Sequence, residues 1–398
     1  MKKLLFCILF LTSLVLNSCA SFQGFPSDSE TAESDFLVYR INLVEQPQLM
    51  LYDPVSNVHT QVLPDWDIGA FSFNINNRLA FSSPRDGDNN KIYIVDYPFT
   101  DNIPTEITHD TSSENYPLSW SPDGKYLLFA SIQAHSKKLL LWDGKNVIEI
   151  YNYHEAVYEI SWSPNNQLAF TDFYTFVFTE DYKGDSSEVF VWDGSRTVSV
   201  SQNPSGYDRY PAWSKDGQLA FQSERNGKYD IFVWDGTSKT KGIPDINTFI
   251  NVAPNLEHSS YGLTWTPSGT LAFSAIGDSD THAQIYEWDG NTITNISQNP
   301  LSNNGAQSWR DDGYWVFITP VSPKNNDIVI RDETNRTILT TNGYYAPAWS
   351  PNGLLMFCTI DPSGWVLSIW NDSEIIEIAH GDISAKWRNG AGVVCSFA

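Results

Sequence analysis

The chain has 398 residues and a formal net charge of −23, with 47 acidic and 24 basic residues. Such an acidic protein is repelled by nucleic acid and by anionic lipid head groups, so the composition argues against both as binding partners. The four cysteines show neither metal-ligand spacing nor the density of a small disulfide-rich protein.

Residues 1–19 are typical of an export signal. Two lysines precede an apolar stretch, Leu4 to Leu16, that is short for a bilayer span. The stretch runs into Asn17-Ser18-Cys19, and this junction resembles the lipobox of bacterial lipoproteins. The resemblance implies that Cys19 becomes the N-terminus and carries the lipid. The alternative is an ordinary secretory signal that is cleaved nearby.

Residues 20–35 are rich in Ser, Asp and Glu and poor in residues that build a core. We expect a flexible acidic tether that reaches on the order of 20–25 Å. It would hold the remaining domain, residues 36–398, close to a membrane. The expected location is therefore the extracytoplasmic side of a bacterial cell envelope, with membrane contact through the lipid anchor alone.

One phrase recurs along residues 36–398. It consists of a tryptophan, a tight turn such as Ser-Pro-Asp-Gly, and an apolar strand such as Leu-Ala-Phe. Good copies start at Trp120, Trp162, Trp213 and Trp265, and weaker ones at Phe73, Trp309, Trp349 and Trp387. The mean spacing of about 45 residues indicates an array of one supersecondary unit.

Residues 210–242 show what one unit builds. A first strand ends at Trp213, a tight turn follows, and residues 218–223 form a second strand. Residues 229–234 form a third strand, and Asp235-Gly236 predicts a two-residue hairpin into a fourth. Four antiparallel strands in about 45 residues make one blade of a β-propeller, so the predicted fold is all-β.

Twelve of the fifteen tryptophans occupy repeat positions, at the start of the phrase or at the end of the third strand. We interpret these as packing between blades rather than as platforms for carbohydrate. Trp66, Trp315 and Trp365 fall outside the pattern, and they are the better candidates for a functional role.

The repeat resembles the propeller domain of TolB-like proteins, whose units also read Trp-Ser-Pro-Asp-Gly, an apolar strand and Asp-Gly. The resemblance covers about residues 36–398 and implies a propeller fold. It departs at the N-terminus, because a TolB protein carries an α/β domain before its propeller and this chain has only the tether there. Any role of that domain in binding envelope partners is not carried over.

Seven complete repeats begin between Phe73 and Trp349, while only eleven residues follow the eighth start at Trp387. We expect residues 384–387 and 393–397 to form the first two strands of a closing blade. Residues 48–53 and 59–63 would supply its third and fourth strands, and residues 36–41 form a strand without a clear place. The prediction is eight blades, with seven as the alternative; closure of this kind removes an open sheet edge.

The loops after second and fourth strands vary most, notably Asp172–Ser187 and Ile243–Ser260. Variable loops on a rigid scaffold often carry function, although they can also be tolerated insertions. Five tyrosines open the innermost strands at the same face. With two aromatic residues of the first insertion they form the predicted ligand-binding set: Tyr116, Tyr158, Tyr210, Tyr261, Tyr345, Phe176 and Tyr182. The alternative is that each tyrosine packs against the next blade.

No catalytic residues are predicted, because the metalloprotease, nucleophile-elbow, P-loop and dinucleotide-binding motifs are all absent from the sequence. No cofactor or metal is expected, although acidic pairs such as Asp86 with Asp88 and Asp278 with Asp280 are a weak signal for Ca²⁺. The leading hypothesis is a monomeric, non-enzymatic envelope protein that binds a protein or glycan ligand. The alternatives are a propeller glycosidase or lyase that uses acidic residues at the channel mouth, and a purely structural envelope protein.

Cys358 and Cys395 fall in predicted second strands of adjacent blades, at positions of opposite parity. This arrangement allows both side chains to face one interface, where an oxidising compartment would let them form a disulfide. The alternative is two buried thiols that pack as small hydrophobic groups.

Overall fold

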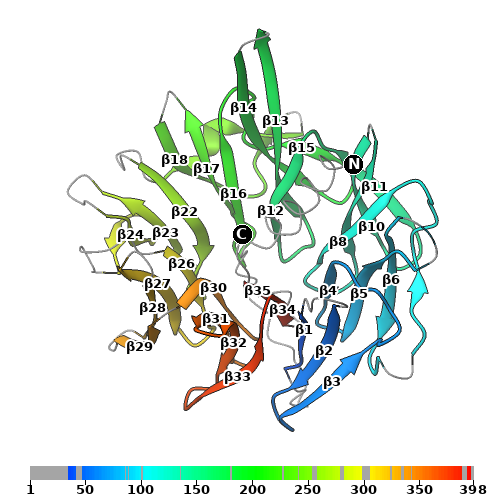
Figure 1. Cartoon of the computed structure of the whole chain (residues 1–398). Helices are drawn as coiled ribbons and strands as arrows, with labels where there is room; N and C mark the ends of the chain where they lie inside the picture. Colours follow the sequence, from blue (N-terminus) through cyan, green and yellow to red (C-terminus); the bar gives the residue numbers. More distant parts are fainter. Residues whose placement is uncertain are drawn as a thin grey trace. The chain divides into compact units, whose positions relative to one another are not determined.

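The computed structural model describes residues 35–41, 47–85, 87, 89–99, 102–134, 136–179, 182–225, 228–240, 242–252, 258–277, 282–297, 305–322, 325–332, 336–341, 343–387 and 392–395. In this part of the chain the regular structure is β, apart from the short 3₁₀ helix η1 (Ile246–Thr248). The strands form eight antiparallel sheets of four or five strands and one small hairpin. The predicted β-propeller with eight blades is therefore confirmed (Figure 1). No described helix is long and apolar enough to cross a membrane.

The chain divides into two compact units, and unit 1 comprises the described residues of 35–152 and 348–395. It contains three complete sheets and most of a fourth, whose first strand begins in unit 2. The strands are β1 (Leu37–Ile41), β2 (Gln48–Asp53), β3 (Val58–Val62), β4 (Phe71–Phe73), β5 (Arg78–Ser83), β6 (Lys91–Asp96), β7 (Thr105–Glu106), β8 (Glu114–Trp120), β9 (Leu127–Gln133), β10 (Ser136–Trp142), β11 (Val147–Asn152), β30 (Gly343–Trp349), β31 (Leu355–Asp361), β32 (Gly364–Trp370), β33 (Ile375–His380), β34 (Ile383–Trp387) and β35 (Gly392–Cys395).

The closing sheet has the order β3-β2-β1-β34-β35, so both ends of the domain contribute strands, as predicted. Strand β1 pairs with β34, from Leu37 opposite Trp387 to Ile41 opposite Ile383. Strand β1, the segment whose place in the blade the sequence did not indicate, is thus the second strand of the closing blade. The prediction that residues 393–397 would form that strand was wrong, because β35 pairs with the other edge of β34. The continuous antiparallel run of β1, β2 and β3 already occupies the first edge.

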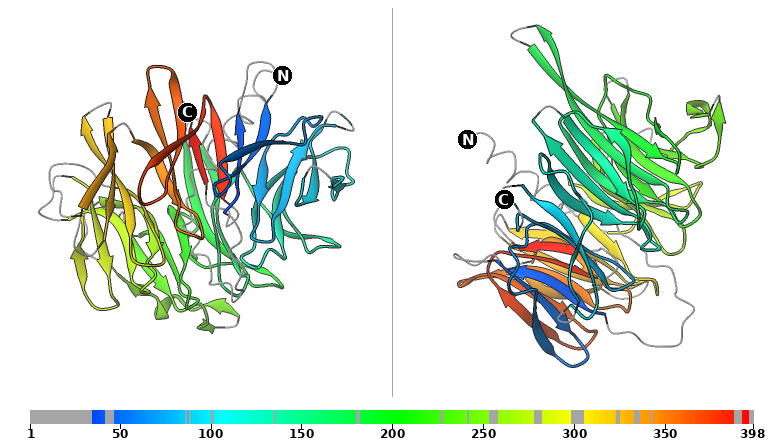
Figure 2. Two further views of the ribbon diagram at one scale, coloured as in Figure 1. Left: turned by 90° about the horizontal axis from the view of Figure 1, so that it is seen from below. Right: turned by 90° about the vertical axis from the view of Figure 1, so that its right-hand side faces the viewer.

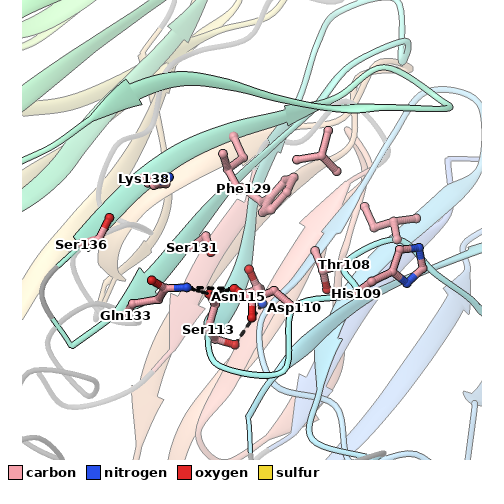
Figure 3. A pocket seen from close by; sticks show the side chains of 13 residues that line it. Thr108, His109, Asp110, Ser113, Asn115, Phe129, Ser131, Gln133, Ser136 and Lys138 are labelled. Atoms are coloured by element: carbon pink, nitrogen blue, oxygen red, sulfur yellow. Dashed lines mark hydrogen bonds between the residues drawn. The ribbon is translucent and has the colours of Figure 1, made fainter.

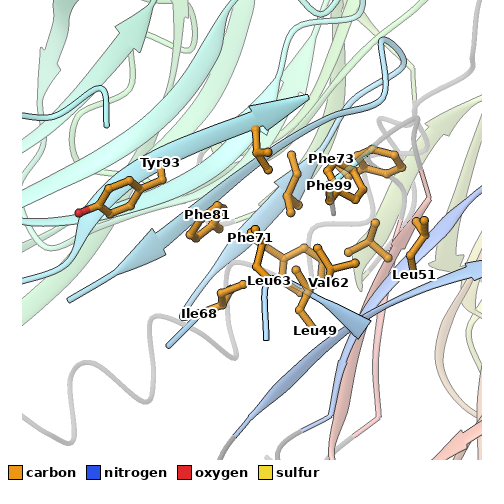
Figure 4. Packing of buried hydrophobic residues seen from close by; sticks show 13 residues of the cluster. Leu49, Leu51, Val62, Leu63, Ile68, Phe71, Phe73, Phe81, Tyr93 and Phe99 are labelled. Carbon is orange, nitrogen blue, oxygen red and sulfur yellow. The ribbon is translucent and has the colours of Figure 1, made fainter. Parts of the chain in front are cut away.

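Apolar side chains of the closing sheet pack against the neighbouring sheet β4-β5-β6-β7 (Figure 4). Leu49 and Leu51 of β2 face Phe71 and Phe73 of β4 in one buried cluster. Phe73 also contacts Phe99 edge-on, with ring centroids 6.0 Å apart. Burial of this kind stabilises a fold by about 1.5–3 kcal/mol for each large apolar side chain.

Unit 2 comprises the described residues of 153–347. It holds four sheets and a small hairpin. The strands are β12 (Ala156–Trp162), β13 (Leu168–Thr179), β14 (Tyr182–Trp192), β15 (Thr197–Ser199), β16 (Asp208–Trp213), β17 (Leu219–Arg225), β18 (Lys228–Trp234), β19 (Lys239–Thr240), β20 (Ile243–Pro244), β21 (Ile250–Asn251), β22 (His258–Trp265), β23 (Leu271–Ile276), β24 (Gln284–Trp288), β25 (Ile293–Asn295), β26 (Gly305–Trp309), β27 (Trp315–Ser322), β28 (Asn325–Arg331) and β29 (Arg336–Thr341).

Both predicted insertions in unit 2 differ from expectation. Residues 172–187 were predicted as a loop, but they extend β13 and β14 into a long hairpin that projects beyond the strands of the next sheet (Figures 1 and 2). The reason is the run of Phe, Tyr, Thr and Val, which favours strands once a ladder has started. In the next sheet the fourth strand is β21, so β19, β20 and η1 all follow the third strand. Part of the second insertion therefore belongs to the opposite end of the strands from the one predicted.

Three first-strand tryptophans hydrogen-bond to a neighbouring sheet, in agreement with the predicted packing between blades. The indole Nε1 of Trp120 donates to the carbonyl of Ser72 at 3.2 Å, and that of Trp387 donates to Ala348 at 3.2 Å. In unit 2, Trp265 donates to Ala212 at 2.9 Å. At these three positions the hydrogen bond helps to set the spacing between neighbouring sheets, whereas Nε1 of Trp213 and of Trp309 is buried without a partner among the described residues, so those indoles act through packing.

Candidate functional site

Two neighbouring innermost strands of unit 2 carry an unusual backbone. The third residue before the repeat tryptophan is left-handed, with φ 56° at Glu159 in β12 and φ 55° at Tyr210 in β16. Pairing with the second strand is interrupted at the same points, as in a β-bulge. Gly262 has the same conformation in β22, with φ 59°, and glycine adopts it without strain. For a residue with a side chain, such as Glu159 or Tyr210, this backbone conformation costs about 1–3 kcal/mol. The cost suggests that the side chains at these two positions have a role.

Glu159 joins the two bulges. Its Oε2 accepts a hydrogen bond from the backbone N–H of Tyr210 at 2.7 Å and another from Thr171 Oγ1 at 2.8 Å. Burial raises the pKa of the Glu159 carboxyl, and these two bonds and the charge of Arg209 oppose the rise. The carboxylate therefore fixes the position of β16 relative to β12 and lies close to a cation.

That cation, Arg209, is surrounded by aromatic rings. Its guanidinium carbon lies 5.9 Å from the ring centroid of Phe173, 5.5 Å from that of Tyr207 and 5.8 Å from that of Tyr210. These distances are within the range of cation–π attraction. The Nε atom is buried and has no hydrogen-bond partner among the described residues. The Tyr229 side chain also interacts with this guanidinium. Because a guanidinium has five N–H donors, it keeps donor capacity for a further group.

Tyr158 completes the group, since its ring meets that of Phe173 edge-on with centroids 5.0 Å apart. We call this group the Arg209 cluster, and it consists of Tyr158, Glu159, Phe173, Tyr207, Arg209 and Tyr210. It draws on β12, β13 and the start of β16, at the base of the long β13–β14 hairpin.

The structure brings two of the five predicted tyrosines, Tyr158 and Tyr210, into this cluster. Tyr116 lies in unit 1, where it is buried in β8 and its hydroxyl donates to Glu114 Oε2 at 3.3 Å. Burial, followed by the charge of Glu114, raises the pKa of Tyr116 to about 12. Such contacts fit the alternative in which a repeat tyrosine packs within the scaffold.

The remaining predicted residues are placed by backbone alone, Tyr261 in β22, Tyr345 in β30, Phe176 in β13 and Tyr182 in β14. Their side chains lie outside the described part of the chain. A common rim of these residues remains a prediction.

Sequence reasoning missed Glu159 and Arg209. Each is the direct neighbour of a predicted tyrosine, Tyr158 or Tyr210. A charged residue inside an otherwise apolar innermost strand was the available signal.

Buried acids near the cluster have their own partners. Asp208 is fully buried, and burial raises its pKa to about 6 against the opposing effects of Ser223, Ser201 and Asn203. Asp172 is also fully buried and its Oδ2 lies 2.7 Å from His154 Nδ1. These carboxylates belong to separate hydrogen-bonded groups, an arrangement that suits a structural role better than paired acid–base catalysis.

Unit 1 contains a hollow of about 330 Å³ beside β9 and β10 (Figure 3). The acid in its lining, Asp110, accepts hydrogen bonds from Ser112, Ser113 and Gln133 at 2.5–2.8 Å. These bonds hold the pKa of Asp110 far below its usual range. Because these donors already satisfy the carboxylate, it stabilises the loop in which it lies and is a poor candidate for ligand binding.

Metal binding has little support in the described structure. Among the residues that it places, no three His, Cys, Asp or Glu side chains are arranged to hold an ion. Asp86, Asp88, Asp278 and Asp280, the weak Ca²⁺ candidates, lie outside the described residues.

Cys358 is buried in β31 and forms a disulfide. Strand β35, which contains Cys395, packs against β31 in unit 1. The side chain of Cys395 is not among those described. Its pairing with Cys358 therefore remains a prediction, although the neighbouring strands are compatible with it. Cys19 also lies outside the described residues.

No protein-family model matches the chain, and no curated protein is similar to it in sequence. Solved structures share the fold. The β-propeller domain of the trilobed protease from Pyrococcus furiosus matches 79% of this chain over 98% of its own length, with 12% identity and a TM-score of 0.52. A prolyl endopeptidase matches 93% of this chain over 58% of its own length, with 9% identity and a TM-score of 0.53.

Prolyl oligopeptidase B from Galerina marginata matches 83% of this chain over 52% of its own length, with 11% identity and a TM-score of 0.54. The chain therefore spans little more than half the length of these two peptidases. At such low identity the likeness defines the class of fold, a β-propeller similar to the propeller domains of peptidases, and not an activity.

Proposed function

We propose that this protein is an envelope-anchored β-propeller lipoprotein that binds a protein or glycan ligand through the Arg209 cluster. The observation that carries the proposal is a guanidinium among three aromatic rings, beside two strained bulges. An arginine surrounded by aromatic rings is well suited to bind a carboxylate or another planar anion through hydrogen bonds. We therefore expect the ligand to present an acidic group next to an apolar or ring surface.

Catalysis receives less support than binding. A glycosidase or lyase would need at least two acids aimed at one bond. Glu159 instead faces Arg209 and its own hydrogen-bond donors, while Asp172 and Asp208 have separate partners. The TolB-like repeat in the sequence agrees with a binding role on an envelope scaffold.

The ligand test uses the protein from residue 20 onward as bait in envelope extracts, with protein and glycan fractions assayed separately. Arg209→Gln removes the cation but keeps a polar side chain, so capture of the ligand should fall at least about tenfold, as expected for a charged contact. Arg85→Gln is the matched control, because Arg85 also stacks on an aromatic ring, 4.3 Å from Trp66, but lies in unit 1. Equal capture by the two variants would remove the Arg209 cluster from the proposal.

The anchor is tested separately, in cells that express the full chain. Cys19→Ala should move the protein from the membrane fraction to the soluble fraction or leave it as an unprocessed precursor of higher mass. Ser18→Ala, which preserves a small residue before the cysteine, should leave the protein in the membrane. A mature Cys19→Ala protein that still sediments with the membrane would rule out lipid anchoring at this residue.

A further inference from the structure

One blade of unit 2 departs from the repeat at its tight-turn end. In five other blades the first residue of the second strand is leucine, and it lies opposite the tryptophan that ends the third strand. These pairs are Leu127 with Trp142, Leu168 with Trp192, Leu219 with Trp234, Leu271 with Trp288 and Leu355 with Trp370. In the sheet β26–β29 the same pair is Trp315 with Arg331. The indole has moved to the second strand, and a cation occupies its usual place.

The exchange changes the packing. In other blades the tryptophan of the first strand meets that of the third strand near 6 Å, as Trp213 meets Trp234 at 6.1 Å. Here Trp309 of the first strand stacks on Trp315 instead, with centroids 5.0 Å apart and planes 15° from parallel. Arg331 lies 6.0 Å from the ring of Trp315. The narrower side chain of Arg331 thus occupies the position that an indole fills in the other blades.

A hollow of about 540 Å³ opens beside these residues, between the sheet β26–β29 and the sheet β22–β25. It lies at the turns that follow the first and third strands, so it is at the other end of the strands from the Arg209 cluster. Its walls include Trp309 and Trp315, four carboxylates (Glu287, Asp311, Asp312 and Asp332) and one cation, Arg331. The lining thus has an excess of negative charge beside an aromatic surface.

Several of these charged groups have partners within the protein. Arg331 donates to the carbonyl of Ile296, and Asp312 accepts from Arg310 Nε at 2.9 Å. Glu287 accepts from the Thr270 hydroxyl. Asp311 is exposed but lies beside Asp312, and partial loss of hydration together with that neighbouring charge raises the pKa of Asp311 against the opposing effect of Lys215. A positive charge brought into the hollow would relieve this repulsion.

We infer that the hollow binds a small organic cation, an aliphatic polyamine with two or more ammonium groups. The volume accommodates a flexible chain of several heavy atoms rather than a bare ion. Carboxylates at separate points of the wall suit ammonium groups spaced along a chain, and Trp309 offers an aromatic surface for the methylene groups and for cation–π attraction. The strongly acidic protein would also concentrate such cations near its surface.

The probe is spermidine, titrated calorimetrically into the protein from residue 20 onward at low and physiological salt. The first variant, Trp315→Leu with Arg331→Trp, restores the pair found in the other blades and refills the space. It also makes the lining more negative, so a non-specific attraction would grow stronger while binding in the hollow would be lost. The second variant, Asp311→Asn, should weaken binding about two- to fivefold, as expected for one exposed charge pair.

Asp143→Asn is the control, because Asp143 accepts hydrogen bonds in the turn between β10 and β11 of unit 1 and lines no part of this hollow. It should bind spermidine as the unchanged protein does. Circular dichroism and thermal unfolding must show that the double variant folds, and Asp311→Asn tests the site independently if it does not. Undiminished binding by the folded double variant, or no saturable binding to the unchanged protein at millimolar spermidine, would overturn the proposal. Either result would leave the Arg209 cluster unaffected.

Discussion

Replacement of Asp208 by asparagine should stabilise the protein at neutral pH. Asp208 is fully buried in β16, and burial raises the pKa of its carboxyl from 3.8 to about 6. The folded protein therefore holds this proton more tightly than the unfolded chain does. As pH rises from about 4 to about 6, the unfolded chain loses the proton first, so the free energy of unfolding falls across that window.

The size of the effect follows from the shift. One pKa unit corresponds to about 1.4 kcal/mol, so a difference of about two units makes the ionised carboxylate cost about 3 kcal/mol above pH 6. Asparagine has nearly the same shape, and its Oδ1 can still accept from Asn203, which lies 3.1 Å from the present carboxylate. The other carboxylate oxygen, Oδ2, is buried and has no hydrogen-bond partner among the described residues, and the nearby Ser223 and Ser201 hydroxyls are the acceptors available to an amide group in its place.

The assay is urea unfolding followed by tryptophan fluorescence between pH 4.5 and 8, for the unchanged protein, Asp208→Asn and Asp216→Asn. Asp216 is exposed in the tight turn of the same sheet, so its substitution controls for the general loss of one negative charge. The difference between Asp208→Asn and the unchanged protein should grow to about 1–3 kcal/mol as pH rises through 6 and then stay constant. A variant that is less stable at pH 7.5, with the same pH dependence as the unchanged protein, would refute the reasoning.

Two further predictions follow from named contacts. Glu159→Gln keeps an acceptor for the Tyr210 N–H and Thr171 but removes the charge beside Arg209. This variant should change the free energy of unfolding by no more than about 1 kcal/mol and should bind an acidic ligand more tightly. Weaker binding would show that the carboxylate itself contacts the ligand. If Cys358 pairs with Cys395, the intact oxidised protein should weigh about two mass units less than its reduced form. Cys395→Ser should then lower the free energy of unfolding by roughly 2–4 kcal/mol, because the covalent loop is lost. A free Cys395 thiol in the purified protein would contradict this pairing.

Much of the architecture could be predicted because it depends on short-range patterns. A Ser-Pro-Asp-Gly turn needs only its own residues: Gly124 takes the positive φ of 68°, and the Ser121 hydroxyl accepts from the N–H of Tyr126 at 2.9 Å. Short apolar strands then repeat at a nearly constant period, and that period indicates blades. The shared closing blade was also predictable, since the last repeat is incomplete and spare strands stand at the start of the domain.

The same patterns misplace elements whose position depends on competition between partners. Residues 37–41 have the composition of a strand, but their sequence does not say which edge they join. The structure pairs them with Ile383–Trp387 at the far end of the chain and leaves residues 392–395 the other edge. Likewise Asp235-Gly236 predicts an immediate hairpin, while the chain inserts β19, β20 and η1 before its fourth strand.

Sequence alone thus determined the strands, their turns and the repeating blade, because each depends on residues within one period of about 45. Tertiary structure decided the candidate sites. Glu159 bonds to Tyr210 across 51 residues of sequence, and Arg209 gains aromatic neighbours from two strands. The exchange of Trp315 and Arg331 likewise has meaning only when the two lie opposite each other in the sheet. The physical reason is that a site is a convergence of side chains in space, and packing between blades, not local propensity, brings them together.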